Sequence, residues 1–585
     1  MTQRLRFISV VALGLCLPAC GRLDDLWNNA TRSPASDAGR AGALDPNALP
    51  GDDAATPTVV EPLPDPADQD AGSISTAESD AGSQESVDAG ADAASSDAPE
   101  LAADAGPDTR PTITAMAFRT GVVEAPVAGA RWVGYIRAGG RIPIVRGPVG
   151  NDGCAARRDT AGAGWYEVDG GGFVCVGPLA MLTTQVTGRP FERRLPTPPD
   201  PSQAMPFQYA IAYRSAPMYR WLPSLEDERE IEPDRFSPRA DTPVDLGLGD
   251  AAVANGSRAD ASAPAARLPD AGPPRIEELE GVAGSPLLRR MTRGMYVSLD
   301  RAVRANTGST FWRTQSGGFV RSGTVSSVRS PPTFQGVRLG EGAGHQLPLA
   351  FAISVQASTY QTNGRGGFAP VQRVARLSTF DLTDEAPVTV AGEQYYHTRD
   401  GYFIRSRQMR VVTRHEVPSD LSPGEKWIDV NLDHQSVVAY EGANPVYVTV
   451  ASTGRRNRGN PDENYETVQG GFRIQSKHMA TTMDGNSAND GPYSIEDVPW
   501  VMYFEQSFAL HGAFWHNGFG MMHSHGCVNL APADARFFFE WSEPRVAPGW
   551  HGAYATPQHL GTRVYVHYDA QALGERGGPD RVPSH

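Results

Sequence analysis

The segment that decides the character of this chain reads HGAFWHNGFGMMHSHGCVN at residues 511–529. It holds one of the five cysteines and four of the thirteen histidines, and it has no acidic residue. A thiol with an ordinary pKa of ~8.5 is only slightly ionised at neutral pH, so a nucleophilic cysteine needs a base. If the run is a strand, His525 shares a face with Cys527. His511 lies far enough upstream to arrive from a neighbouring strand or loop.

The region around this segment has the alternation and turns of a β domain. Three runs typical of strands lie at 427–432, 435–440 and 445–450, and a fourth lies at 561–567. Residues 532–541 are expected to form a short helix, because Pro532 suits a first turn and Pro544 follows the end. We therefore predict a mainly β domain with one short helix over residues 416–570.

Several motifs of this region together resemble one family. His511-Gly512 is followed by Ser524-His-Gly-Cys-Val-Asn529, and upstream stand Ser-Thr-Gly at 452–454 and Thr-x-x-Gly-x-Phe-x-Ile at 467–474. In order and spacing, residues 426–568 resemble the L,D-transpeptidase (YkuD) domain of bacterial peptidoglycan enzymes. The resemblance implies a β-sandwich. One departure is Val468, where many members have a proline.

The resemblance also implies roles for the residues of the motif. Cys527 is the expected nucleophile, and His511 is the expected general base and later general acid. The backbone carbonyl of Gly512 would orient His511 in place of a triad carboxylate. His525 is expected to help shape the pocket or the oxyanion site, and the amides of Gly526 and Cys527 are expected to hold the oxyanion. The remaining members of the motif, expected to support the site, are Ser524 and Asn529.

The implied reaction is acyl transfer from peptidoglycan stem peptides. A thioester forms at the carbonyl of a diaminoacid in position 3, D-alanine leaves, and an amine acceptor resolves the thioester. If water resolves it, the same site is an L,D-carboxypeptidase or endopeptidase. A non-catalytic wall-binding lipoprotein is the other alternative.

Other chemistries fit the sequence less well. His511, His516, His523, His525 and Cys527 are all possible zinc ligands, but His-x-His-x-Cys is not a usual zinc spacing. We therefore expect neither a metal nor a cofactor, and we expect His516 and His523 to be exposed or structurally hydrogen-bonded, with no catalytic role. Papain-like proteases have the cysteine before the histidine, and a sortase would not have Ser-His-Gly before its cysteine. No basic patch indicates a nucleic-acid partner.

The start of the chain has the order of a bacterial export signal. Arg4 and Arg6 precede a short apolar run, which is too short to span a bilayer as a helix. The run ends in Leu-Pro-Ala-Cys at 17–20, which resembles a lipobox, so residues 1–19 are the expected signal peptide and Cys20 the expected lipidation site. Because residue 21 is not aspartate, we expect an anchor in the outer membrane, on its periplasmic face. The alternative is a soluble exported protein.

The segment that follows is acidic and of low complexity. Residues 22–110 contain nineteen acidic residues and four arginines, so their net charge of −15 equals that of the whole chain. With few apolar residues, residues 20–110 are expected to be a disordered tether about 50 Å long on average. The acidic balance therefore describes the tether and says nothing of the catalytic domain.

Between tether and catalytic domain, three similar stretches predict small β units. Residues 166–175, 312–321 and 396–405 each combine an aromatic residue, a Gly-containing turn and a returning Phe-β-branched pair, which is typical of hairpins. We expect about three barrels that resemble bacterial SH3-like domains, at 111–190, 281–345 and 346–415. A connector with a low-complexity insert would occupy 191–280, and a tail 571–585.

Two cysteines bracket the first hairpin. In an exported protein Cys154 and Cys175 are expected to form a disulfide. Two free buried thiols or a metal pair are the alternatives.

Overall fold

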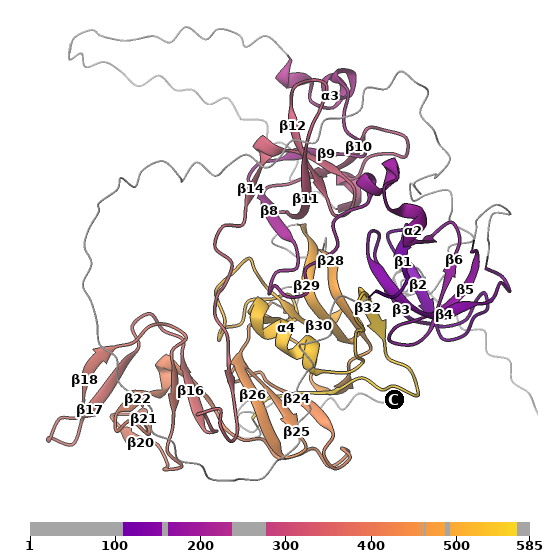
Figure 1. The fold of residues 1–585 in the computed structure, drawn as a ribbon. Coiled ribbons are helices and arrows are strands. Elements are labelled where there is room, and N and C mark those ends of the chain that lie inside the picture. The colour runs from indigo at the N-terminus through magenta and orange to yellow at the C-terminus, as the bar shows by residue number, and fades with distance from the viewer. Residues whose placement is uncertain are drawn as a thin grey trace, which may run out of the picture.

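The computed structural model describes residues 109–154, 162–236, 276–457, 459–460, 464–485 and 492–569. The expected signal peptide, Cys20, most of the tether and the tail lie outside these residues. Among the described residues, no helix is both long and apolar enough to cross a membrane. The fold is mainly β, as predicted, and four groups of strands are distinguishable in Figure 1.

The region predicted to be catalytic is a sandwich of two sheets with one helix. The first sheet has the order β15-β26-β25-β24-β33-β27, and it includes the strands predicted at 427–432, 435–440 and 445–450. Its strands are β15 (Val337–Arg338), β24 (Lys426–Asn431), β25 (Ser436–Glu441), β26 (Asn444–Val450), β27 (Gly470–Arg473) and β33 (Arg563–His567). The helix α4 spans Pro532–Trp541, with the proline in its first turn, so this prediction is confirmed.

The second sheet carries the segment quoted at the start. Its strands are β28 (Ser476–Gly485), β29 (Tyr493–Glu505), β30 (Phe508–Gly512), β31 (Val528–Leu530) and β32 (Gly552–Tyr554). Alternate residues of both sheets and two phenylalanines of α4 form one buried core, represented by Ile428, Val564, Met502, Leu510 and Phe538. Because strands bury alternate side chains, the other face of the second sheet is left for the site.

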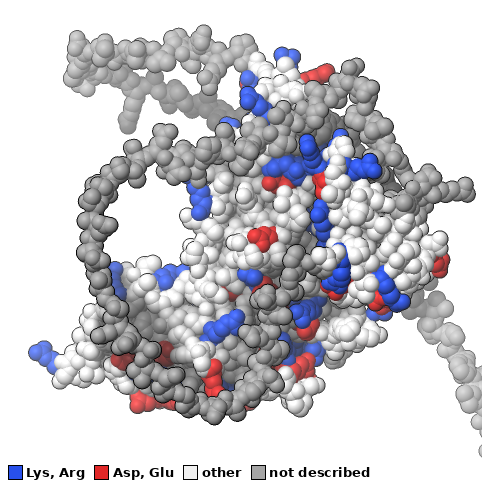
Figure 2. Space-filling view, in the orientation of Figure 1, with Lys and Arg blue, Asp and Glu red and all other residues white. Residues whose placement is uncertain are grey.

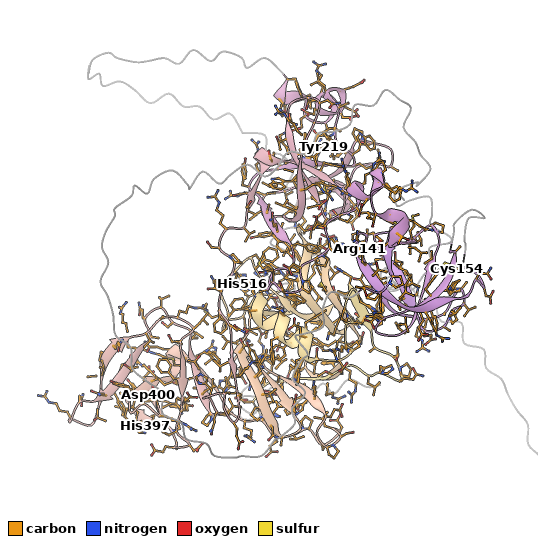
Figure 3. All side chains as sticks on the ribbon, in the orientation of Figure 1. Arg141, Cys154, Tyr219, His397, Asp400 and His516 are labelled. Carbon is orange, nitrogen blue, oxygen red and sulfur yellow. A yellow bond between two sulfur atoms is a disulfide. The ribbon has the colours of Figure 1, made fainter. Side chains whose placement is uncertain are left out.

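Unit 1 is a group of seven strands that joins the second sheet directly. Its strands are β1 (Thr112–Ala115), β2 (Thr120–Val123), β3 (Trp132–Ile136), β4 (Arg141–Gly150), β5 (Gly164–Val168), β6 (Phe173–Val176) and β7 (Ala180–Leu182), followed by the short helix α2 (Thr183–Val186). β3 pairs antiparallel with β32, so Tyr135 lies opposite Gly552. Cys154 and Cys175 form the predicted disulfide, and Figure 3 places Cys154 within this unit.

Unit 2 differs from the expected division of the chain. Its strands are β8 (Gln208–Ala212), β9 (Ala216–Tyr219), β10 (Leu287–Met291), β11 (Tyr296–Arg304), β12 (Thr310–Thr314), β13 (Phe319–Arg321) and β14 (Val325–Ser327), with the helix α3 (Leu225–Ile231). β8 pairs with β11 and β14, and β9 pairs with β10 and β13. Residues 191–280 are therefore more than a connector, because two of their strands belong to unit 2. The low-complexity insert interrupts unit 2, and for this reason the sequence placed the start of the unit too late, at residue 281.

Unit 3 contains the remaining strands, in a three-stranded and a five-stranded sheet. They are β16 (Leu349–Ala352), β17 (Ser358–Thr362), β18 (Phe368–Arg373), β19 (Thr379–Asp381), β20 (Val388–Val390), β21 (Glu393–His397), β22 (Phe403–Arg405) and β23 (Met409–Val412). All three predicted hairpins are present, as β5–β6, β12–β13 and β21–β22, and in each the aromatic residue faces the β-branched one. The likeness of the units to SH3 domains stays a prediction.

The charges of the described residues are mixed. On the face drawn in Figure 2, Lys and Arg lie among Asp and Glu, and broad uncharged areas separate them.

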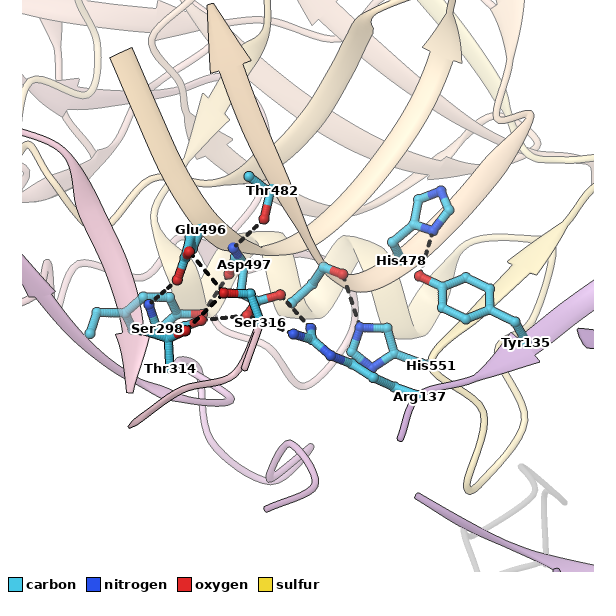
Figure 4. A network of polar contacts seen from close by, with 12 residues as sticks. Tyr135, Arg137, Ser298, Thr314, Ser316, His478, Thr482, Glu496, Asp497 and His551 are labelled. Carbon is cyan, nitrogen blue, oxygen red and sulfur yellow. Dashed lines mark hydrogen bonds and ion pairs between the residues drawn. The ribbon is translucent and has the colours of Figure 1, made fainter. Parts of the chain in front are cut away.

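A buried polar network holds units 1 and 2 against the hairpin β28–β29 (Figure 4). Arg137 of unit 1 donates two hydrogen bonds to Asp497, one of them at 3.0 Å, and Ser298 of unit 2 donates to the same carboxylate. Glu496 accepts from Ser316 at 3.0 Å. Burial opposes ionisation of Asp497, yet the Arg137 charge keeps the pKa of this carboxyl below its usual value. The network therefore contains a paired, ionised carboxylate away from water.

Removing one partner of this pair tests its importance for the assembly. We expect Arg137→Met to lower the free energy of unfolding by about 3–5 kcal/mol, because Asp497 would keep a buried, unpaired charge. Arg141→Met is the matched control. Its ion pair with Glu192 is largely exposed, so its loss should cost about 0–1 kcal/mol. Urea unfolding followed by tryptophan fluorescence measures both, and equal losses would contradict the assignment.

Candidate active site

The pairing of β30 with β31 brings His511 and Cys527 to one face of the second sheet. The two strands are parallel, with Leu510 opposite Val528 and His511 opposite Asn529. Leu510 and Val528 point into the core between the sheets. Side chains alternate along a strand, so His511 and Asn529 lie on the opposite face, and Cys527, one residue before β31, adjoins it. Cys527 packs there with Ala509, which belongs to a separate apolar cluster.

His511 is held as a neutral imidazole. Its side chain is 2% exposed and stacks on Trp515, with the ring centroids 5.7 Å apart. The predicted contact with Gly512 is present, because Nδ1 lies 3.4 Å from the carbonyl oxygen of that residue. Burial lowers the pKa of His511 to about 4. With the proton on Nδ1, the free lone pair is on Nε2, as a general base requires.

Cys527 is an un-ionised thiol in this arrangement. It is the free cysteine of the described residues, and it is partly buried. Its Sγ lies 3.5 Å from the carbonyl oxygen of Ser507. Desolvation raises the pKa of the Cys527 thiol to about 11, and a hydrogen bond from the Ala509 amide opposes this only in part. At neutral pH the pair is therefore thiol and imidazole, and not thiolate and imidazolium.

The Ser-Thr-Gly segment and Thr467 brace the loop before the cysteine. Isolated bridges join Ser452 to Asn529 and Gly454 to Ser524. The Thr467 hydroxyl donates to the carbonyl oxygen of Gly526 at 2.7 Å and accepts from the Gly454 amide at 2.9 Å. Sequence reasoning had singled out Thr467 only as a motif residue. Its buried hydroxyl ties both motifs to the loop.

Ser524 and Gly526 shape the loop from within. The Ser524 hydroxyl donates to the carbonyl of Cys527 and accepts from the Gly526 amide at 3.1 Å. The expectation that the Gly526 amide holds the oxyanion is therefore wrong, because this N–H already has a partner, and the Cys527 amide remains as the candidate. Gly526 has φ +130°, and a Cβ there would lie 2.8 Å from the ring of Phe508, so a side chain would strain the loop.

His525 does not share a strand face with Cys527. Residues 525–527 form a bend, and the side chain of His525 is exposed. Its ring stacks on Tyr493 at 5.3 Å, and Arg455 donates to its Nε2 at 2.7 Å. It therefore lines the rim of the site beside two other polar side chains.

His516, which is partly buried, and Asn529, which is buried, support the site from below, and Figure 3 labels His516. The Gly518 amide donates to Nδ1 of His516 at 3.0 Å, which leaves the proton on Nε2. That nitrogen lies 3.0 Å from the Asn529 side-chain amide. Turning the amide so that its oxygen accepts from Nε2 satisfies both groups. Burial, aided by the charges of neighbouring groups, lowers the pKa of His516 to about 3. His516 thus has the structural role expected for it.

Metal-ligand groups converge elsewhere in the described part of the chain. Ligand atoms of His415, Asp429 and His567 lie within 4.8 Å of one another. Asp429 and His567 belong to the first sheet, whereas Cys527 adjoins the second. Nε2 of His567 lies 2.7 Å from Asp429, so these two groups already form an ion pair. Among the described residues, the histidines near Cys527 do not gather in this way.

Residues 425–566 match the family model YkuD, described as the L,D-transpeptidase catalytic domain. This segment belongs to that family. No curated protein sequence matches the chain. The L,D-transpeptidase domain accounts for the motif order and for the sandwich that presents it.

Thirty-six chains of solved structure match. The catalytic domain of an E. faecium L,D-transpeptidase is 23% identical, with 25% of this chain and 98% of that chain covered and a TM-score of 0.19. An L,D-transpeptidase from Mycobacterium smegmatis is 13% identical, with 44% and 90% covered and a TM-score of 0.19. L,D-transpeptidase 3 from Mycobacterium tuberculosis, in complex with a faropenem-derived adduct, is 18% identical, with 28% and 72% covered and a TM-score of 0.19.

The protonation state of Cys527 is directly testable by alkylation. With a pKa of about 11, the rate with iodoacetamide should rise about tenfold per pH unit from pH 7 to 10. The modified Cys527 peptide is quantified by mass spectrometry, so that other thiols do not interfere. His511→Gln should leave this rise unchanged. A rate that is level from pH 5 to 8 would instead indicate a thiolate–imidazolium pair.

Proposed function

We propose that this protein is a peptidoglycan L,D-transpeptidase in which Cys527 is the nucleophile and His511 the general base. The observation that carries the proposal is the parallel register of β30 and β31, which presents a buried neutral imidazole beside a thiol on one sheet face. An acyl transfer between two amides needs no redox partner, and a cysteine–histidine pair suffices for it.

The first half-reaction forms a thioester. Nε2 of His511 takes the Sγ proton as sulfur attacks the carbonyl that links the diaminoacid to D-alanine. The tetrahedral oxyanion is placed near the Cys527 amide. When the C–N bond breaks, His511 returns the proton to the leaving amine, and D-alanine departs.

The second half-reaction restores the enzyme. An acceptor amine attacks the thioester, His511 takes its proton, and the C–S bond breaks to give a new amide and the thiol. Because both resting groups are neutral, His511 must move a proton in each half-reaction. This makes the imidazole more than an electrostatic partner of a preformed thiolate.

We also propose an envelope location for this chemistry. A lipid at Cys20 would anchor the chain in the outer membrane on the periplasmic side, and the acidic segment would let the catalytic domain reach the wall. The disulfide between Cys154 and Cys175 fits an oxidising compartment. Pairing of these two cysteines leaves Cys527 as the free thiol there.

Release of D-alanine from a disaccharide tetrapeptide by the full chain tests the proposal. We expect turnover with an amine acceptor and a covalent adduct with a carbapenem at Cys527, seen by intact mass. Cys527→Ser should abolish both, and His511→Gln should lower kcat by about 10²–10⁴-fold. His397→Gln, in unit 3, is the control and should keep full activity.

Two results would change the assignment. If D-alanine leaves but the product mass shows water in place of the amine, the site is a carboxypeptidase. If neither D-alanine release nor a carbapenem adduct is seen in a folded protein, the enzyme proposal is wrong and the wall-binding alternative holds.

A further inference from the structure

We propose that Arg119 of unit 1 forms, with a row of tyrosines that leads to Cys527, a subsite for a carboxylate of the donor peptide. The inference rests on the proposed function and adds a specificity-determining residue from outside the catalytic domain. It stands on strand register, on the partners of the arginines in unit 1, and on a tyrosine hydroxyl that has no hydrogen-bond partner among the described residues.

The register of the second sheet lines up a row of side chains. Tyr554 lies opposite Ser476, and Ser476 lies opposite Tyr503. Tyr503 lies opposite Ala509, which adjoins Cys527 through the parallel pairing of β30 and β31. Residues paired in this way point to the same face. Apart from Ala509, every member of the row is partly exposed.

The length of the row suits a peptide. Neighbouring strands are about 4.8 Å apart, so Tyr503 lies roughly 10 Å and Tyr554 roughly 19 Å from Cys527 along the sheet. An extended chain rises about 3.3 Å per residue, so roughly three residues reach from Cys527 to Tyr503 and roughly six would reach Tyr554. The main chain of a tetrapeptide donor with its scissile carbonyl at Cys527 therefore reaches Tyr503, and its carboxylate-bearing side chains extend from there toward the far end of the row.

Unit 1 closes that far end. The pairing of β3 with β32 places Tyr135 beside the row, where its hydroxyl lies 3.0 Å from Nδ1 of His478. The ring of Tyr135 is 6.4 Å from that of Tyr554, and His478 is 5.7 Å from the ring of Tyr503. Figure 4 shows Tyr135 and His478 meeting from the two parts of the chain.

Arg119 lies beside the contact between Tyr135 and His478. Its guanidinium carbon lies 5.1 Å from the ring centroid of Tyr135. The other described arginines between residue 109 and the end of β6 each pair with an acid, namely Arg110 with Asp169, Arg131 with Glu124, Arg137 with Asp497, Arg141 with Glu192, and Arg146 with Glu167. Within the described residues, Arg119 has no such partner. A guanidinium that is partly buried and uncompensated favours an anionic ligand.

Two further observations indicate an anion at this end of the row. The Tyr554 hydroxyl is buried and has no hydrogen-bond partner within the described residues, so it is free to donate. Burial, and next the charge of Arg119, lower the pKa of His478 to about 3, so no second cation competes there. A carboxylate can accept from the guanidinium and from a phenol at once. Stem peptides carry such carboxylates, which makes the donor the ligand that fits.

The test compares two donors on the full chain. One tetrapeptide has free carboxylates, and the other has the same sequence with its side-chain and α-carboxylates amidated upstream of the scissile bond. We expect Arg119→Gln to lower kcat/KM for the free donor about tenfold to a hundredfold, chiefly through KM, and to leave the amidated donor unchanged. Arg119→Lys should recover part of the loss. Arg131→Gln, which breaks an exposed pair of the same unit, should change neither donor.

Binding separates this inference from the proposed function. Calorimetry with Cys527→Ser measures the affinity for each donor without turnover, and Arg119→Gln should weaken only the free donor. If the free donor binds in this pattern but is never turned over, the proposed function fails and the subsite stands. If Arg119→Gln has no effect, or weakens both donors equally, the subsite is overturned. Should Arg119→Gln not fold, Tyr554→Phe replaces it, with a smaller loss expected for the free donor alone.

Discussion

The parallel pairing of β30 with β31 is the contact on which the site depends. It spans three residue pairs, yet it decides which side chains face the core and which face outward. Val528 and Leu510 enter the sandwich, so Cys527 and His511 must adjoin the other face. A shift of one residue would exchange the two sets, and would bury the thiol among apolar side chains. Bridges from residues 452–454 to Ser524 and Asn529 hold the end of the connection between β30 and β31, and this keeps the register in place.

The electrostatics of the site follow from its burial. Within the part of the chain that the structure describes, no carboxylate orients His511, and a backbone carbonyl takes that role at 3.4 Å. A carbonyl holds the proton on Nδ1 without adding a full negative charge, so it does not favour an imidazolium. Desolvation then acts on both partners, lowering the pKa of the imidazole and raising that of the thiol. The resting site stays neutral, and the charge appears only when the reaction begins.

Units 1 and 2 are joined to the second sheet by backbone hydrogen bonds, so they are not separate domains connected only by linkers. Unit 1 adds β3 to the edge strand β32, and unit 2 meets β29 through β11. The buried carboxylate of Asp497 holds both units against the same hairpin, through the ion pair with Arg137 of unit 1 and the hydrogen bond from Ser298 of unit 2. Such a charged pair gives little net stability, but its strict geometry defines one arrangement. This arrangement is what brings a side chain of unit 1 to the row that leads from Cys527.

Local sequence by itself determined the strands, the three hairpins, the helix at 532–541 and the identity of the motif residues, because each depends on neighbours within a few residues. The disulfide also followed from two cysteines that bracket one hairpin. The predicted boundaries of unit 2 were wrong because its strand pairing is non-local. β8 and β9 precede a long insert and pair with strands beyond it. The prediction that His525 shares a strand face with Cys527 was wrong, because Gly526, with φ +130°, turns the chain before Cys527. The neutrality of the His511–Cys527 pair, the occupied amide of Gly526 and the place of Arg119 depend on burial and register, which only the tertiary structure decides.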